Sequence, residues 1–192
     1  MTRTAEITRK TKETDIALRL NLDGAGDTDI NTGIGFLDHL LTALTLHARF
    51  DLTLACKGDL DIDDHHTAED CAICLGQAID RALGERTGIA RFASAYAPLD
   101  ESLSRAVVDL ATRPHASIDL GMTRERIGAL ACENIPHILE TLAVNARFTL
   151  HVDVLKGTND HHRAESAFKS VALALRQAVA RADGPTSTKG TL

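Results

Sequence analysis

The chain has 192 residues, with 21 basic and 27 acidic side chains and a formal net charge of −6 at pH 7. This length can bury a substantial core, and 44% hydrophobic with 25% charged residues excludes a disordered or fibrous chain. The acidic balance and the aromatic content of 3% argue against nucleic acid as a partner, because such partners require basic side chains and stacking rings.

The hydrophobic pattern predicts strands alternating with helices along the chain. Apolar and polar residues alternate through residues 16–22, as in a half-buried strand. A helix is expected from about residue 35 to His47, and the apolar segment 50–54 is typical of a second strand. Apolar residues then recur with a helical period over 65–83, and Gly84 is expected to end that helix.

An internal repeat organises this pattern. Residues 39–50 align with 137–148, both ending in Ala-Arg-Phe, and DHHTAE at 64–69 aligns with DHHRAE at 160–165. We expect two similar halves, residues 1–95 and 96–183, and a mobile tail rich in Gly, Pro, Ser and Thr at 184–192. The predicted fold is α/β, an α+β two-layer sandwich in which each half is a sheet covered on one face by helices.

Signals for export or membrane insertion are missing from the sequence. The N-terminal segment MTRTAEITRKTKET is polar where a secretory signal requires an apolar stretch. No run of about 18 apolar residues occurs, so no membrane span is expected. Cys71 and Cys74 form a CxxC, but they lie in a helical segment without a second such pair. We expect buried thiols in a reducing compartment, hence a cytoplasmic protein.

The repeated HHxxE motif points to metal chemistry. Its first histidine and its glutamate are four residues apart and share a helix face, whereas the second histidine points about 100° away and can reach a different ion. A further repeated histidine precedes each motif. The candidate ligands are His39, His65, His66, Glu69, His137, His161, His162 and Glu165. Six imidazoles and two carboxylates suit two ions, and the lack of thiolates favours ions with positions open to water or substrate.

Lone histidines are more often packed or solvated residues than ligands. His115 and His151 have no repeat partner of this kind and are expected to be structural or exposed. His47 aligns with Asn145, so it is not a duplicated ligand, although it is close enough to the motifs to touch a substrate.

Several cations suggest an anionic substrate. Lys169 lies four residues after Glu165 on the same helix face, with no acidic partner evident in the sequence. Taken singly, the other candidates are typical of a solvated surface, but together they suit a phosphate site. They are Arg91, Arg113, Ser187, Thr188 and Lys189. Glycine motifs for nucleotide phosphates do not occur.

Five segments resemble the imidazoleglycerol-phosphate dehydratase family, namely Gly33–His39, Asp63–Asp70, Gly88–Phe92, Pro98–Glu101 and His161–Lys169. The resemblance covers nearly the whole chain in order. It implies the sixth step of histidine biosynthesis, two manganese(II) ions per active site, and a homo-oligomer of trimers assembled into a large cubic particle. No phosphatase segment is fused to the chain, so only the dehydratase activity is expected.

Combined with the helix geometry, the resemblance implies how the ligands divide. One ion would be bound by His39, His66, His161 and Glu165, and the other by His65, Glu69, His137 and His162. In the family, the ligands of one ion come from separate subunits. The substrate is expected to contact Glu13, His39, His47, Arg91, Arg113, Lys169, Ser187, Thr188 and Lys189.

The implied reaction converts imidazoleglycerol phosphate into imidazole acetol phosphate. The carbon-bound hydrogen is not acidic, so two metals on the ring nitrogens would favour an imidazolate that expels the hydroxyl through a diazafulvene-like intermediate. Glu13, at a position where the family has a substrate-contacting glutamate, is our candidate for moving protons, with His47 as a second catalytic candidate. The sequence leaves open whether Glu13, a metal-bound water or His47 takes each proton.

Two other functions compete with this one. A non-catalytic metal-storage protein would use the histidines equally well, but it would give the cations no role. A metal-dependent hydrolase is the second alternative, because HHxxE also resembles hydrolytic sites.

Overall fold

The computed structural model describes residues 3–183, which form two halves with the same order of elements. The first half contains β1 (Thr4–Lys10), β2 (Thr14–Asn21), β3 (Thr28–Asn31), α1 (Gly35–Ala48), β4 (Asp51–Gly58) and α2 (His65–Leu83). The second half contains β5 (Phe92–Leu99), β6 (Ser102–Asp109), β7 (His115–Asp119), α3 (Asn134–Asn145), β10 (Thr149–Lys156) and α4 (Asp160–Ala178). A short hairpin between β7 and α3 comprises β8 (Arg126–Ile127) and β9 (Leu130–Ala131).

Each half has a four-stranded mixed sheet, and the two sheets share one topology. Their strand orders are β1-β2-β4-β3 and β5-β6-β10-β7. In both sheets the first three strands are antiparallel and the fourth runs parallel to its neighbour. This common topology fits the duplication that the sequence repeat predicts.

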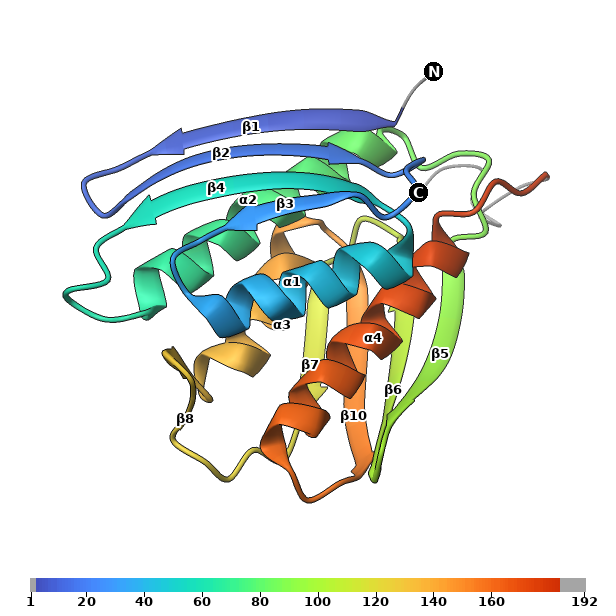
Figure 1. Cartoon of the computed structure of the whole chain (residues 1–192). Coiled ribbons are helices and arrows are strands. Elements are labelled where there is room, and N and C mark those ends of the chain that lie inside the picture. The colour runs from blue at the N-terminus through green and yellow to red at the C-terminus, as the bar shows by residue number, and fades with distance from the viewer. Residues whose placement is uncertain (1–2, 184–192) are drawn as a thin grey trace.

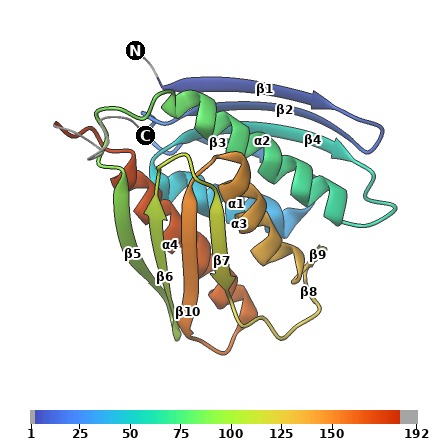
Figure 2. The ribbon, with the colours of Figure 1, turned by 180° about the vertical axis from the view of Figure 1, so that it is seen from behind.

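The helices lie between the two sheets and cover the inner face of each (Figure 1). Helix α1 packs against α4, and α2 packs against α3, so each helix of one half meets a helix of the other. Figure 2 shows the same layers from behind. Buried apolar residues of all four helices and both sheets join in one core. The predicted α+β architecture of two packed, similar halves is confirmed.

The repeated Ala-Arg-Phe triplet ends helices α1 and α3. Arg49 and Arg147 take the left-handed conformation that commonly terminates a helix, with φ of 58° and 55°. The next residues, Phe50 and Phe148, are 1% and 0% exposed and enter the core. The triplet therefore turns the chain from each helix into the strand that precedes an HHxxE motif.

Two glycines shape helix α2. Gly84 ends it with φ of +57°, as the sequence predicts. Gly76 lies against α3, where a Cβ atom would come within 2.8 Å of the Leu142 carbonyl oxygen. A side chain at this position would push the two helices apart, and these helices carry Glu69 and His137.

A buried arginine connects the end of α2 to the second half. The Arg86 side chain has no exposed surface, and its guanidinium donates to the carbonyls of Leu110, Ala146 and Arg147 and to the carboxylate of Asp80. These bonds satisfy carbonyl groups at the ends of β6 and α3 that would otherwise be buried without partners.

Other predictions fare differently. Strand β1 is not evident from the sequence, because only Ala5 and Ile7 of this polar segment are buried. The expected boundary at residue 95 lies inside β5, which is a strand of the second sheet.

Cys71 and Cys74 are 1% and 0% exposed free thiols, as expected. No helix within residues 3–183 has the length and apolar character needed to cross a membrane.

Candidate metal and active site

Helices α1 and α4 bring three predicted ligands together, His39, His161 and Glu165, which we call cluster 1. Their candidate ligand atoms all lie within 4.8 Å of one another. Glu165 Oε2 is 2.8 Å from His39 Nε2 and 3.2 Å from His161 Nε2. The ring of Phe36 packs against both imidazoles, with centroid distances of 5.9 Å to His39 and 4.9 Å to His161.

Helices α2 and α3 form the equivalent cluster 2 from His65, Glu69 and His137. The candidate ligand atoms again lie within 4.8 Å of one another. His137 Nε2 is 3.0 Å from Glu69 Oε1, and the His65 and His137 rings stack with centroids 5.2 Å apart. Both clusters join the motif of one half to the single histidine of the other, because α1 meets α4 and α2 meets α3.

The second histidine of each motif, His66 or His162, lies outside the cluster that contains the first histidine of the same motif, as the helix geometry predicts. His66 Nδ1 is 3.0 Å from Asp59 Oδ2, and His162 Nδ1 is 2.7 Å from Glu101 Oε2. These hydrogen bonds raise the pKa of both imidazoles above the ordinary value. The bond from His162, together with two backbone N–H groups, lowers the pKa of Glu101 to about 2. In each case Nδ1 faces a carboxylate, and Nε2 is the nitrogen left for an outside ligand.

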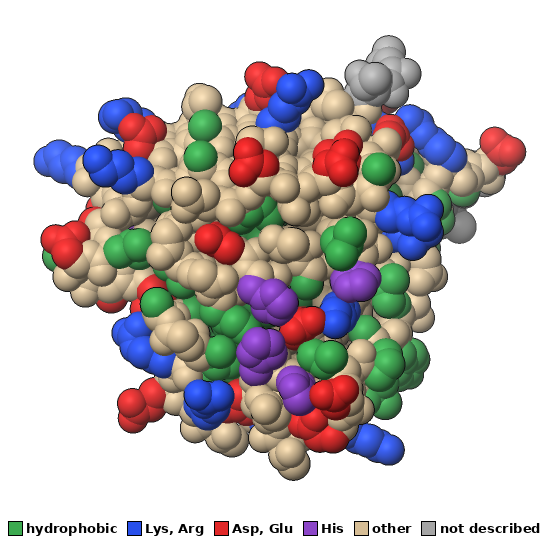
Figure 3. All heavy atoms as spheres, viewed as in Figure 1, with side chains coloured by type: hydrophobic (Ala, Val, Ile, Leu, Met, Phe, Trp, Pro, Cys, Tyr) green, Lys and Arg blue, Asp and Glu red, His purple; other side chains and the backbone are tan. Residues whose placement is uncertain are grey.

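Lys169 has an acidic partner, contrary to the expectation that it would have none. Its Nζ lies 2.6 Å from Glu165 Oε1, while Glu165 Oε2 faces the histidines of cluster 1. Burial acts to raise the pKa of Glu165, but Lys169 and His39 outweigh it and lower that pKa to about 2. Figure 3 shows several histidine side chains close together on one face of the molecule, with acidic and basic side chains among them.

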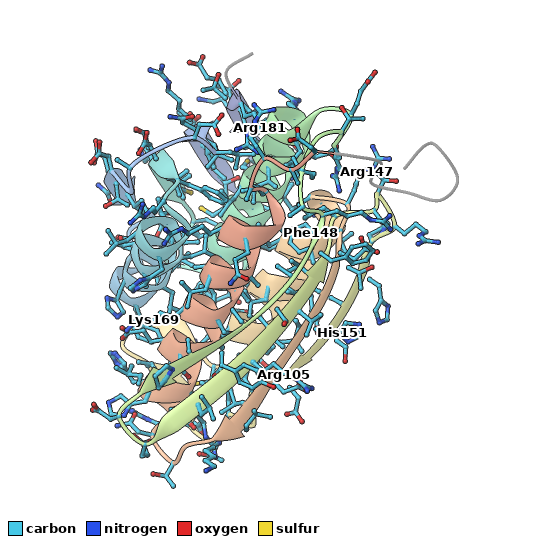
Figure 4. The ribbon with its side chains drawn as sticks, turned by 90° about the vertical axis from the view of Figure 1, so that its right-hand side faces the viewer. Arg105, Arg147, Phe148, His151, Lys169 and Arg181 are labelled. Atoms are coloured by element: carbon cyan, nitrogen blue, oxygen red, sulfur yellow. The ribbon has the colours of Figure 1, made fainter. Side chains whose placement is uncertain are left out.

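His47 lies near this same group. Partial burial, and then the positive charge of Lys169, lower the pKa of its imidazole, so the ring is neutral near pH 7. His47 follows His39 by about two turns of α1, and a neutral imidazole there can accept a proton. His115 and His151 are exposed, as predicted, and their rings contact each other at a tilt of 52° with centroids 5.5 Å apart. In Figure 4, His151 lies across the second sheet from Lys169.

Arg91 and Arg113 are not near the clusters within one chain. The backbone N–H of Arg91 donates to Ala178 at the end of α4, whereas His161 lies at its start. At 1.5 Å per residue, about 25 Å separates these helix ends. Arg91 is also not a solvated surface cation: it is 9% exposed and binds Asp109 through two nitrogens at 2.7 and 3.2 Å. Arg113 is exposed.

The remaining candidates are Glu13 and the tail residues. Glu13 lies in the turn between β1 and β2 with its side chain 52% exposed, and its Oε1 is 3.8 Å from His66 Nε2. It therefore faces the second histidine of the first motif. Ser187, Thr188 and Lys189 lie outside the described residues.

Comparisons with known proteins agree on one family. The family model described as imidazoleglycerol-phosphate dehydratase matches residues 32–175, which include both clusters. The chain belongs to this family. A Neurospora crassa protein named imidazoleglycerol-phosphate dehydratase is 55% identical, and the alignment covers 99% of this chain and 96% of that protein. A Phytophthora nicotianae protein of the same name is 58% identical over 99% of this chain, which spans only 42% of that longer relative.

Solved structures show the same relationship. The crystal structure of imidazoleglycerol-phosphate dehydratase from Staphylococcus aureus has a TM-score of 0.84 at 32% identity, covering 93% of this chain and 99% of that one. The structure from Pyrococcus furiosus has a TM-score of 0.84 at 34% identity, covering 97% and 100%. The chain is thus a member of a family of dehydratases, which are hydro-lyase enzymes.

Sequence reasoning missed several polar residues around the two clusters. Asp59 and Glu101 hold the second histidines, and Asn134 binds His65 with Asp64 behind it. Glu101 lies in one of the segments that resemble the family, but its sequence position indicates no role. Asn134 precedes His137 by three residues on one helix, a spacing that places both side chains on the same face.

Proposed function

We propose that the chain dehydrates imidazoleglycerol phosphate to imidazole acetol phosphate in histidine biosynthesis, using two manganese(II) ions per active site. The observation that carries this proposal is the pair of clusters, each with two imidazoles and one carboxylate within 4.8 Å, in a member of a dehydratase family. Nitrogen and oxygen donors without thiolates fit a first-row divalent ion of this kind. When bound, such ions supply the Lewis-acid charge that favours a deprotonated substrate ring.

The fourth ligand of each ion comes from His66 or His162 of another subunit. Each cluster offers three ligands within one chain, and both second histidines direct Nδ1 to their own carboxylates. The first ion would thus be held by cluster 1 with His66, and the second by cluster 2 with His162. This arrangement requires a homo-oligomer, and the family resemblance suggests trimers built into a cubic particle.

Chelation tests this assembly. Metal that bridges subunits stabilises the assembled state by mass action, and its ligands must be deprotonated. We expect a chelator, or a pH well below the free-histidine value of about 6.5, to reduce the particle size in sizing chromatography. Manganese near neutral pH should restore it. An unchanged size after verified metal removal would contradict the intersubunit ligands.

Protons are moved by Glu13, with His47 as the second candidate. Glu13 has an exposed carboxylate that faces His66. If His66 binds the ion of a neighbouring subunit, Glu13 therefore lies at that same neighbouring site. His47 lies about two helical turns after His39 on α1, and partial burial and Lys169 lower the pKa of its imidazole. The two groups could therefore meet one substrate from two subunits.

The phosphate is bound by cations from more than one subunit. Lys169 lies beside cluster 1, but Arg91 and Arg113 lie near the opposite end of the second half. If both arginines bind substrate, they reach a neighbour's site. Ser187, Thr188 and Lys189 remain candidates for contacts to the same phosphate. Arginine forks and a lysine suit a phosphate dianion. We place this enzyme in the cytoplasm.

Incubation of the purified protein with manganese and imidazoleglycerol phosphate tests the activity. A dehydratase forms an enolisable ketone and releases no phosphate. Phosphate release would indicate a hydrolase instead, and metal binding without turnover would indicate storage. Protein treated with chelator serves as the control.

A further inference from the structure

We propose that Asn134 is a positioning residue that keeps the proton of His65 on Nδ1 and thereby leaves Nε2 as the metal-binding nitrogen. This inference rests on the proposed function, because it concerns a ligand of cluster 2. It assigns a role to Asn134, which is not itself one of the proposed metal ligands.

Asn134 connects His65 to a buried carboxylate. It is the first residue of α3 and is 3% exposed. Its Oδ1 lies 2.9 Å from His65 Nδ1, and its Nδ2 donates to Asp64 Oδ2 at 2.9 Å. The amide is thus held on both sides by residues that are adjacent in the sequence.

The chemistry of Asp64 decides which way the amide faces. Asp64 is 5% exposed, and it accepts bonds from the Ala131 backbone N–H at 2.7 Å and from Arg126 Nη1 at 3.2 Å. A carboxylate only accepts hydrogen bonds, so the NH₂ group of Asn134 must face it. The amide oxygen then faces His65 and can only accept, so Nδ1 must carry the proton. A neutral imidazole has one N–H, and Nε2 therefore keeps a lone pair for a metal.

This connection crosses between the two halves. Asp64 and His65 begin α2, whereas Asn134, Ala131 and Arg126 belong to α3 and the β8–β9 hairpin. The packing of this hairpin on the start of α2 therefore sets the tautomer of a ligand in cluster 2.

Cluster 1 has a different residue at the equivalent place. Phe36 precedes His39 by three residues, as Asn134 precedes His137, and its ring packs on the imidazoles of cluster 1. The duplicated site is therefore asymmetric, with an aromatic side chain supporting one cluster and an amide supporting the other. Loss of the amide should affect one ion only.

The test compares manganese binding by metal-free wild-type protein and by Asn134→Leu, using equilibrium dialysis and the Mn²⁺ electron paramagnetic resonance signal. Two sites are expected in the wild type. In the variant one site should weaken about 10- to 100-fold and the other should keep its affinity. Asn145→Ala is the matched control, because this asparagine also lies on α3 but bonds only its own helix carbonyl at Thr141. It should retain both sites.

Three outcomes would overturn the inference. Asn134→Leu with two sites of normal affinity would show that the amide does not position His65, and equal weakening of both sites would show a general structural role. If Asn134→Leu fails to fold, Asn134→Ala removes the amide without adding bulk, and its binding of two ions at wild-type affinity would also refute the proposal. Wild-type protein that binds no manganese would instead refute the proposed function itself.

Discussion

Replacement of Lys169 by methionine separates substrate binding from metal binding. Methionine keeps an unbranched side chain of similar length but removes the ammonium group, which contacts Glu165 Oε1 at 2.6 Å. The Lys169 side chain is 20% exposed, so part of the charge faces the surface beside cluster 1. We expect Lys169→Met to retain both manganese ions and to bind the phosphorylated substrate less tightly.

The loss of substrate affinity can be estimated from the energy of a charged hydrogen bond and from the contact of Lys169 with Glu165. A hydrogen bond to a charged group contributes about 1.5–3 kcal/mol, and 1.4 kcal/mol corresponds to a factor of ten. Complete loss of a phosphate contact therefore weakens binding roughly 10- to 150-fold. Lys169 already pairs with Glu165 in this structure, and sharing its protons between two anions reduces the gain from phosphate. We therefore expect a loss near the lower end of the range.

The assay compares two ligands on two proteins. Binding of imidazoleglycerol phosphate and of its analogue without phosphate is measured for wild type and for Lys169→Met. The variant should lose affinity for the phosphorylated ligand only. Lys156→Met, which changes an exposed lysine at the end of β10, controls for the overall loss of one positive charge.

Equal impairment with both ligands would refute a phosphate contact. If manganese affinity falls while discrimination between the two ligands is kept, Lys169 acts by holding Glu165 in the orientation that directs Oε2 to the cluster.

Three further predictions concern other parts of the molecule. Glu13→Gln should keep two manganese ions but lower turnover by about two orders of magnitude or more, as for loss of a general acid or base, and near-normal turnover would remove Glu13 from the reaction. Arg86→Met should lower the free energy of unfolding by about 3–5 kcal/mol, because it leaves buried partners unpaired, and a melting temperature within about 2 °C of wild type would contradict this. Asp51 accepts backbone N–H groups of residues 25–27; partial burial opposes them, but they hold the pKa of its carboxyl below the ordinary 3.8. The stability that the ionised Asp51 carboxylate contributes is therefore fully present above pH 3.8, and it is lost as the pH falls through the folded-state pKa. Near neutral pH, Asp51→Asn should be less stable than wild type by about 1–3 kcal/mol. Urea unfolding should show this difference shrinking in acid.

The ligand clusters could be predicted from sequence because their rules are local. An i, i+4 spacing places His65 with Glu69 whatever the remainder of the chain does, and the same holds for His161 with Glu165. The repeat then relates the single histidine of each half to a matching one, although only the packing of α1 on α4 shows that His39 joins His161.

Residues whose roles depend on long-range packing could not be predicted in this way. Arg91 looked like one of several surface cations, but a left-handed backbone and Asp109 hold it at the far end of α4. Asn134 reaches His65 across 69 positions of sequence, and no periodicity connects the two. Strand β1 was missed because it buries few apolar side chains and pairs along β2, a neighbour whose own pattern is much stronger.

The central claim is that two manganese ions, held by clusters 1 and 2, support dehydration without loss of phosphate. A titration of metal-free protein with manganese, following ketone formation and bound metal together, tests it most directly. We predict negligible turnover without metal, a rise with manganese that saturates at two ions per chain, and no inorganic phosphate in the product. Full turnover in metal-free protein, or saturation at one ion per chain or fewer, would contradict the claim.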